Sequence, residues 1–148
     1  MSRHPSLFQR IAFLAAFAFL SSCHSAADNL PGDSSDHRPW QDIAPDETVR
    51  FTGTEPFWGG EVAGSRLTWS TPDNPLGTVV EVSRFAGRGG LSFSGEMGGK
   101  ALTMTITPGD CSDGMSDYRY PFGATVRLGD ELRQGCGWTE RQPRTGAK

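Results

Sequence analysis

Histidine and lysine are scarce in this sequence, and their absence limits the chemistry that it can perform. All three histidines lie within the first 37 residues: His4, His24 and His37. The rest of the chain therefore has none of the usual Ser-His or Cys-His catalytic pairs and no His-containing zinc site. Lysine occurs only as Lys100 and Lys148, so a Ser-Lys dyad would depend on Lys100. We expect a protein without enzymatic activity, cofactor or bound metal.

Long apolar runs are limited to one, residues 11–20, which is too short for a membrane-spanning helix of about 20 residues. Arg3 and Arg10 precede this run, and small residues lead from it to Cys23. A basic start, a short apolar run and small residues before a cleavage point are typical of a secretory signal peptide. Together with the cysteine, the segment resembles the bacterial lipobox. We therefore expect residues 1–22 to be a lipoprotein signal peptide and Cys23 to be the lipid-modified first residue of the mature chain.

An alternative is an ordinary signal peptide cut after Ala26 or Ala27, which would export the chain without a lipid. If Cys23 is lipidated, its acyl chains anchor the protein stably, because each buried CH₂ contributes roughly 0.8 kcal/mol. The second mature residue is His24 rather than aspartate, which favours the outer membrane by resemblance to enteric sorting signals. We expect a protein of the bacterial cell envelope that faces the periplasm and is held to the membrane by its N-terminal lipid.

Cysteine is otherwise limited to Cys111 and Cys136. An oxidising compartment favours a disulfide between them. On the chain-entropy model, closing a loop of about 25 residues would stabilise the fold by roughly 3.5 kcal/mol. The alternative is a reactive thiol, which needs a nearby histidine or cationic cluster to lower its pKa. No histidine lies near either cysteine in the sequence.

Composition divides the mature chain into three parts. Residues 23–46 are rich in Ser, Asp, Pro and Gly, which predicts a flexible linker behind the lipidated N-terminus. Residues 47–141 are expected to form one small domain, and residues 142–148 a disordered tail. Twelve basic and seventeen acidic side chains give the mature chain a net charge of −5. This charge argues against nucleic acid as a partner and mildly favours cationic proteins.

The apolar residues of the domain repeat at the spacing of strands, and no window has a helical stripe. Leu102, Met104 and Ile106, for example, alternate with threonines, as in a half-buried strand. Glycine-rich turn signals separate the candidate segments. The eight predicted strands are residues 49–52, 57–63, 66–70, 78–85, 91–94, 102–107, 122–127 and 131–138.

Eight short strands that each bury one face can form a closed barrel or a two-sheet sandwich, and we favour the barrel. The predicted fold class is therefore all-β, a small antiparallel β-barrel. Its interior should be filled, without a ligand cavity, by Phe51, Leu67, Trp69, Val80, Val82, Phe93, Leu102, Met104, Ile106, Ala124, Val126 and Leu132.

Two segments stand out from this background: residues 53–58 (GTEPFW) and residues 111–117 (CSDGMSD). Tyr118, Tyr120 and Pro121 follow the second segment. The combination resembles a family of poorly characterised bacterial lipoproteins that share both segments ahead of a Tyr-Pro pair. The resemblance covers most of residues 50–138. It implies a lipoprotein but no established activity, substrate or catalytic residue.

The first segment places the carboxylate Glu55 beside the aromatic residues Phe57 and Trp58. A glycan-binding or glycan-cleaving site uses such a pairing, with an aromatic ring as stacking platform and a second carboxylate about 5 to 10 Å away. Asp113 or Asp117 would have to supply that carboxylate. The alternative is structural: Phe57 and Trp58 enter the core, and Glu55 accepts backbone N–H groups in a turn.

The second segment carries Asp110, Asp113 and Asp117 around Gly114, which suggests a calcium loop. The spacing of an EF-hand loop does not fit. When Gly114 is aligned with the glycine of such a loop, several positions that must supply oxygen ligands hold other residues. The alternative is a compact turn held by Cys111, in which the aspartates accept nearby backbone N–H groups and Gly114 has a positive φ. We favour the compact turn.

These features favour a lipid-anchored, non-enzymatic binding or envelope-maintenance domain. Its partner would be a periplasmic protein or peptidoglycan. One alternative is an inhibitor of c-type lysozyme, suggested by architecture and charge alone. Another is a peptidoglycan-binding, glycan-binding or glycan-cleaving domain that uses Glu55 and Asp113. The candidate binding residues are Glu55, Trp58, Asp113, Asp117 and Tyr118.

Overall fold

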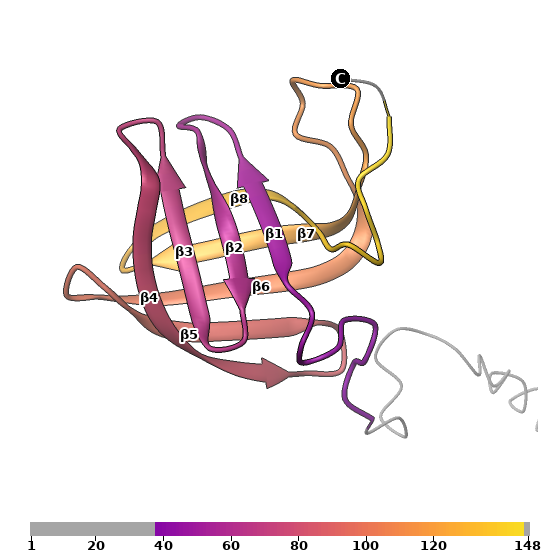
Figure 1. Cartoon of the computed structure of the whole chain (residues 1–148), viewed down its shortest axis with the longest axis horizontal. Helices are drawn as coiled ribbons and strands as arrows, with labels where there is room; N and C mark the ends of the chain where they lie inside the picture. Colours follow the sequence, from indigo (N-terminus) through magenta and orange to yellow (C-terminus); the bar gives the residue numbers. More distant parts are fainter. Residues whose placement is uncertain (1–37, 147–148) are drawn as a thin grey trace, which may run out of the picture. The chain divides into compact units, whose positions relative to one another are not determined.

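Eight antiparallel strands follow one another around a closed barrel in the computed structural model (Figure 1). Each strand pairs with the next in sequence, and β8 pairs with β1. The strands are β1 (Val49–Gly53), β2 (Trp58–Ala63), β3 (Arg66–Thr71), β4 (Asn74–Ala86), β5 (Leu91–Met97), β6 (Lys100–Cys111), β7 (Tyr120–Leu128) and β8 (Glu131–Trp138). The prediction of a small antiparallel β-barrel with eight strands is confirmed, and the sandwich alternative is wrong.

The structure describes residues 38–146. The predicted signal peptide, Cys23 and residues 24–37 of the predicted linker lie outside the described residues. Within the described residues, no helix is long and apolar enough to cross a membrane.

Side chains along the strands point alternately into the barrel and out of it, as the sequence predicts. On β6, Leu102, Met104 and Ile106 are at most 1% exposed, while the threonines between them face outward. Tight turns join the strands, and Gly64 and Gly129 occupy two of them with φ of 60° and 58°. Glycine enters this left-handed region without steric cost, so the hairpins form where the sequence places these residues.

Aromatic rings fill one part of the interior. The rings of Trp58 and Trp69 stack with centroids 4.9 Å apart, and Phe51 lies against both at 5.8 and 6.2 Å. Their neighbours are small: a Cβ on Gly60 would lie 3.0 Å from the Phe51 ring and 1.8 Å from the Thr68 carbonyl oxygen. Of the predicted core residues, all but Leu132 are buried.

Leu132 is 54% exposed, so its predicted place in the core is wrong. The β7–β8 hairpin pairs Leu132 with the exposed Arg127, which puts both side chains on the outer face. Its neighbour Arg133 pairs with the buried Val126 and lies 5.8 Å from the Trp69 ring. The hairpin register, rather than the local apolar pattern, decides which face of β8 is inside.

The folded part begins before the predicted boundary at residue 47. Ile43 is 1% exposed within the core cluster, and its carbonyl accepts a hydrogen bond from Arg84 Nη2 at 2.9 Å. Trp40 donates its backbone N–H to Gly87 at 2.7 Å and meets the Phe122 ring edge-on at 5.8 Å. Two apolar side chains thus dock a segment whose average composition is that of a linker.

The chain after β8 is also folded further than predicted, through Gly146. The isolated bridge between Arg119 and Thr145 carries two backbone hydrogen bonds, of 2.8 and 2.9 Å. Figure 1 shows this C-terminal segment running beside the β6–β7 loop. The predicted disordered tail from residue 142 therefore does not apply to residues 142–146.

Cys111 at the end of β6 and Cys136 in β8 form a disulfide, as predicted. The two cysteines are 25 residues apart in the chain. Replacing both by serine should lower the free energy of unfolding by roughly 3 kcal/mol, because the unfolded chain then gains the entropy of an open loop. Urea unfolding of the mature domain measures the change. Reduction of the wild-type disulfide is the matched control and should give the same loss, and a loss below about 1 kcal/mol would contradict this account.

Candidate functional site

The two unusual sequence segments lie against each other. Gly53 at the end of β1 pairs with Gly135 of β8, next to Cys136 and its disulfide to Cys111. Beyond this pairing, Thr54 Oγ1 donates a hydrogen bond of 3.4 Å to the carbonyl oxygen of Asp113, 59 residues later in the chain. A hollow of about 200 Å³ is lined by residues of both loops and by Gln134 and Gly135 of β8. We call residues 54–57 and 112–119 the paired loops.

In the first of the paired loops, Glu55 has a φ of 56°, an uncommon conformation for a residue with a side chain. Its side chain is exposed, and no hydrogen bond or ion pair within residues 38–146 holds its carboxylate. The predicted hydrogen bonds from backbone N–H groups to Glu55 are therefore absent from this part of the chain. The carboxylate is free to meet a partner in solvent.

Trp58 and Phe57 separate at the start of β2. Trp58 is 4% exposed and stacks on Trp69, so it is a core residue and cannot serve as a surface stacking platform. A Cβ on Gly53 would lie 2.2 Å from the Trp58 ring, which makes glycine necessary there. Phe57 precedes the strand and is 53% exposed, so its predicted place in the core is wrong. With Pro72 and Pro75 it lines an open groove of about 340 Å³.

Asp113 organises the second of the paired loops. Its Oδ1 accepts the backbone N–H groups of Met115 and Ser116 at 3.0 and 2.8 Å. Its Oδ2 accepts the Ser116 hydroxyl at 2.8 Å and the Tyr120 hydroxyl at 3.0 Å. These bonds, led by the one from the Met115 N–H, hold the pKa of Asp113 well below its usual range. The carboxylate is therefore charged at neutral pH, and its hydrogen-bonding capacity is already used by these four donors.

The compact turn predicted for this segment is observed. Gly114 has a φ of 72°, and the disulfide holds the loop at Cys111. Asp117, in contrast, is exposed and makes no side-chain hydrogen bond with any described residue. Among residues 38–146, no three acidic, histidine or cysteine side chains are placed to hold a metal ion. Met115, which sequence reasoning did not select, is 65% exposed at the tip.

An aromatic cluster made of Tyr118, Tyr120 and Trp138 extends from the second of the paired loops, to which Tyr118 belongs, to β7 and β8. The Tyr120 ring is 6.2 Å from that of Tyr118 and 5.5 Å from that of Trp138. The guanidinium of Arg144 lies over two of the rings, 4.1 Å from Tyr118 and 5.0 Å from Trp138. Burial, with the neighbouring Asp113 carboxylate, raises the pKa of Tyr120, and Arg144 opposes part of this rise. Of these aromatic residues, only Tyr118 is among the candidate binding residues predicted from the sequence.

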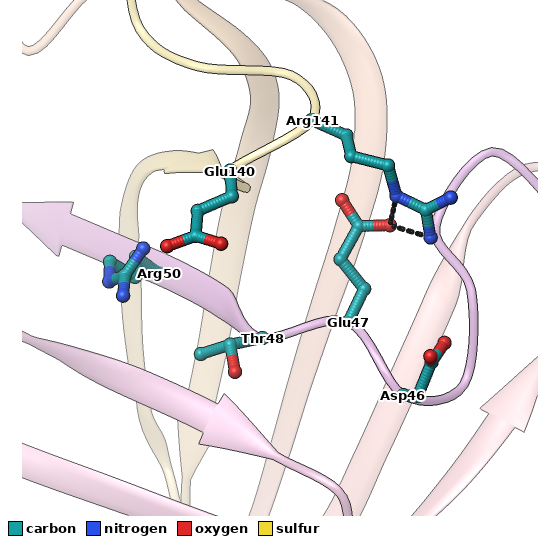
Figure 2. A pocket seen from close by; sticks show the side chains of 6 residues that line it. All are labelled: Asp46, Glu47, Thr48, Arg50, Glu140 and Arg141. Atoms are coloured by element: carbon teal, nitrogen blue, oxygen red, sulfur yellow. Dashed lines mark hydrogen bonds and ion pairs between the residues drawn. The ribbon is translucent and has the colours of Figure 1, made fainter.

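A third pocket, of about 330 Å³, lies between the segments that flank the barrel (Figure 2). Glu47 Oε2 accepts hydrogen bonds from Arg141 Nε at 3.1 Å and from the Ala44 N–H at 3.3 Å. Oε1 is enclosed and has no hydrogen-bond partner among the described residues. Figure 2 shows Glu140 pointing toward Arg50 rather than toward Glu47.

Burial alone would raise the pKa of Glu47, but the Thr139 hydroxyl, the Ala44 N–H and the Arg141 guanidinium together lower it. The Thr139 hydroxyl is near enough to favour the charged form, although its geometry falls short of a hydrogen bond. Because the free oxygen is enclosed, a ligand in the pocket cannot reach it. We interpret the Glu47–Arg141 pair as a structural link between the two flanking segments.

No family model matches the chain, no curated protein is significantly similar to it, and no solved structure matches it. The resemblance to lipoproteins that share residues 53–58 and 111–117 therefore stays a prediction.

Asp113→Asn should lower the free energy of unfolding by about 1 to 2 kcal/mol at pH 7, because an amide replaces a charged acceptor of four hydrogen bonds. Asp117→Asn, in the same loop but without such bonds, is the matched control and should change little. Urea unfolding of the three proteins measures the difference.

The pH dependence of this difference follows from the sign of the pKa shift. The pKa of Asp113 is lower in the folded protein than in the unfolded chain, so its stabilising effect is complete above the unfolded value. The advantage of wild type over Asp113→Asn should stay constant above about pH 5 and shrink as the pH falls below about 4. An advantage that grows on acidification would contradict the assignment.

Proposed function

We propose that this protein is an exported lipoprotein, anchored through Cys23, whose barrel is a non-enzymatic domain that binds a periplasmic partner with the paired loops. The observation that carries the proposal is the Thr54–Asp113 contact, which joins the two loops into one surface. A disulfide and the Asp113 hydrogen bonds support this surface from behind. Each loop carries an exposed apolar side chain, Phe57 in the first and Met115 in the second, which a partner can bury.

Rigid loops with exposed apolar tips suit binding because little conformational entropy is lost when a partner docks. The exposed Glu55 carboxylate adds a charged group to the edge of the same surface. Together with the net charge of −5 in the mature chain, it favours a partner with a basic binding surface. The partner class that fits best is therefore a cationic protein of the periplasm.

Two features support a non-enzymatic role over glycan cleavage. The Asp113 carboxylate already accepts four hydrogen bonds, three within its own loop and one from Tyr120 at the start of β7. Trp58, the candidate stacking platform, is buried. The alternative of a c-type lysozyme inhibitor gains no support from a specific contact.

Site-specific photo-crosslinking in cells tests the proposal. A photoreactive amino acid would replace Phe57 or Met115 in the full-length lipoprotein. Leu132 and Phe85 are the matched control positions, because their exposures of 54% and 68% resemble the 53% of Phe57 and the 65% of Met115. We expect one defined protein to be captured from positions 57 and 115 and not from positions 85 and 132. Mass spectrometry of the product identifies the partner.

Capture of the same proteins from all four positions, or of none from positions 57 and 115, would overturn the proposed binding surface. Crosslinks to glycan strands instead of protein would favour the peptidoglycan-binding alternative. Cys23→Ser serves as the anchoring control: it should move the protein from the membrane fraction to the soluble periplasm. The fold should be unaffected, since the barrel begins far along the chain from this residue.

A further inference from the structure

A positively charged side chain of the same protein rests on the aromatic cluster. The Arg144 guanidinium lies 4.1 Å from the centre of the Tyr118 ring and 5.0 Å from that of Trp138. A planar guanidinium is attracted by the negative face of an aromatic ring and stacks on it. The hydroxyl of Tyr120, one of the three aromatic residues, donates a hydrogen bond to the charged carboxylate of Asp113, which makes the potential at the cluster more negative. The site is therefore suited to a cation.

The segment that carries Arg144 is held at both ends. Arg119 and Thr145 exchange two backbone hydrogen bonds in an isolated bridge, and Gly146 packs against the backbone of Asp117 and Tyr118. At the start of the segment, Arg141 pairs with the Glu47 carboxylate, whose side chain is only 6% exposed. A partner therefore needs to displace only the Arg144 side chain, by a change of rotamer that leaves the backbone of the segment in place.

We infer that the aromatic cluster of Tyr118, Tyr120 and Trp138 is a binding site for an arginine side chain of a partner protein, and that Arg144 occupies it in cis until the partner displaces it. The inference rests on the proposed binding function and specifies the chemistry of the partner. We specify arginine because the site already holds one, Arg144. Tyr118 belongs to residues 112–119, so the aromatic cluster is continuous with the paired loops.

Arg144 is then a competitor that sets the affinity for a partner. Because Arg144 belongs to the same chain, it competes at an effective concentration in the millimolar range, and an arginine of a partner binds only by displacing it. The same geometry favours arginine over lysine, because a compact ammonium lacks the planar face that stacks between rings. Removal of Arg144 should uncover the site without disturbing the barrel, whose strands end at Trp138.

The test uses the mature full-length chain and a blocked peptide with the sequence Gln-Pro-Arg-Thr-Gly, which reproduces residues 142–146. The Trp138 indole signal in NMR spectra, assigned by its loss in Trp138→Phe, reports binding. We expect Arg144→Ala to bind this peptide about tenfold more tightly than the wild-type chain does. Arg144→Lys should fall between the two. A peptide with alanine in place of arginine should bind to neither.

The tyrosine that stacks on the guanidinium gives a second, independent measurement. In the Arg144→Ala background, Tyr118→Phe keeps the aromatic face and should retain peptide binding. Tyr118→Leu removes that face and should weaken binding about tenfold. Equal binding by wild type and Arg144→Ala, or equal binding by the phenylalanine and leucine variants, would overturn the inference. Unchanged signals from Trp58 and Trp69 would show that the barrel of each variant remains folded.

The two proposals fail in different ways. If the peptide does not bind while crosslinking from positions 57 and 115 still captures one partner, the arginine site is wrong and the binding surface stands. If the peptide binds as expected while crosslinking captures no partner, the arginine site stands and the proposed function is wrong.

Discussion

The pairing of β1 with β8 is the constraint on which the rest of the structure depends. Four residue pairs form this contact, from Arg50 with Trp138 to Gly53 with Gly135, and they join positions up to 88 residues apart in the chain. The strands approach closely at the end where Gly53 pairs with Gly135, because neither residue has a side chain: a Cβ on Gly135 would lie 2.2 Å from the Thr52 carbonyl oxygen. Closing the barrel at this point leaves no exposed sheet edge.

The same pairing assembles the candidate site. It places Cys136 where the end of β6 can reach it, and it brings Thr54 beside the loop that Asp113 organises. The loops themselves bury little apolar surface, so their shape depends on one disulfide and on the hydrogen bonds of one carboxylate. Such loops keep apolar side chains exposed without collapsing onto the barrel, which is what a preorganised binding surface requires.

The sequence predicts the strands and most of the core because alternation is a local property that burial on one face imposes. It fails at Leu132 and Phe57, where the deciding facts are the hairpin register and the residue at which β2 begins. It also fails at Trp40, Ile43 and Arg144, because each makes contacts with distant parts of the chain while its neighbours have the composition of a linker. The paired loops could be suspected as motifs, but only the register of β1 with β8 shows that they touch.

The two cationic contacts of the C-terminal segment differ in a way that bears on function. Arg141 is bonded to a carboxylate that is almost fully enclosed, so separating them would leave a buried charge unpaired, which is costly. Arg144 rests on aromatic faces, where its charge can return to water and leave only half-buried rings behind. The Arg141 contact is thus fixed, whereas the Arg144 side chain is exchangeable. An arrangement of this kind limits any displacement to the Arg144 side chain, and it lets an arginine from another protein take the place of Arg144 without loss of the fold.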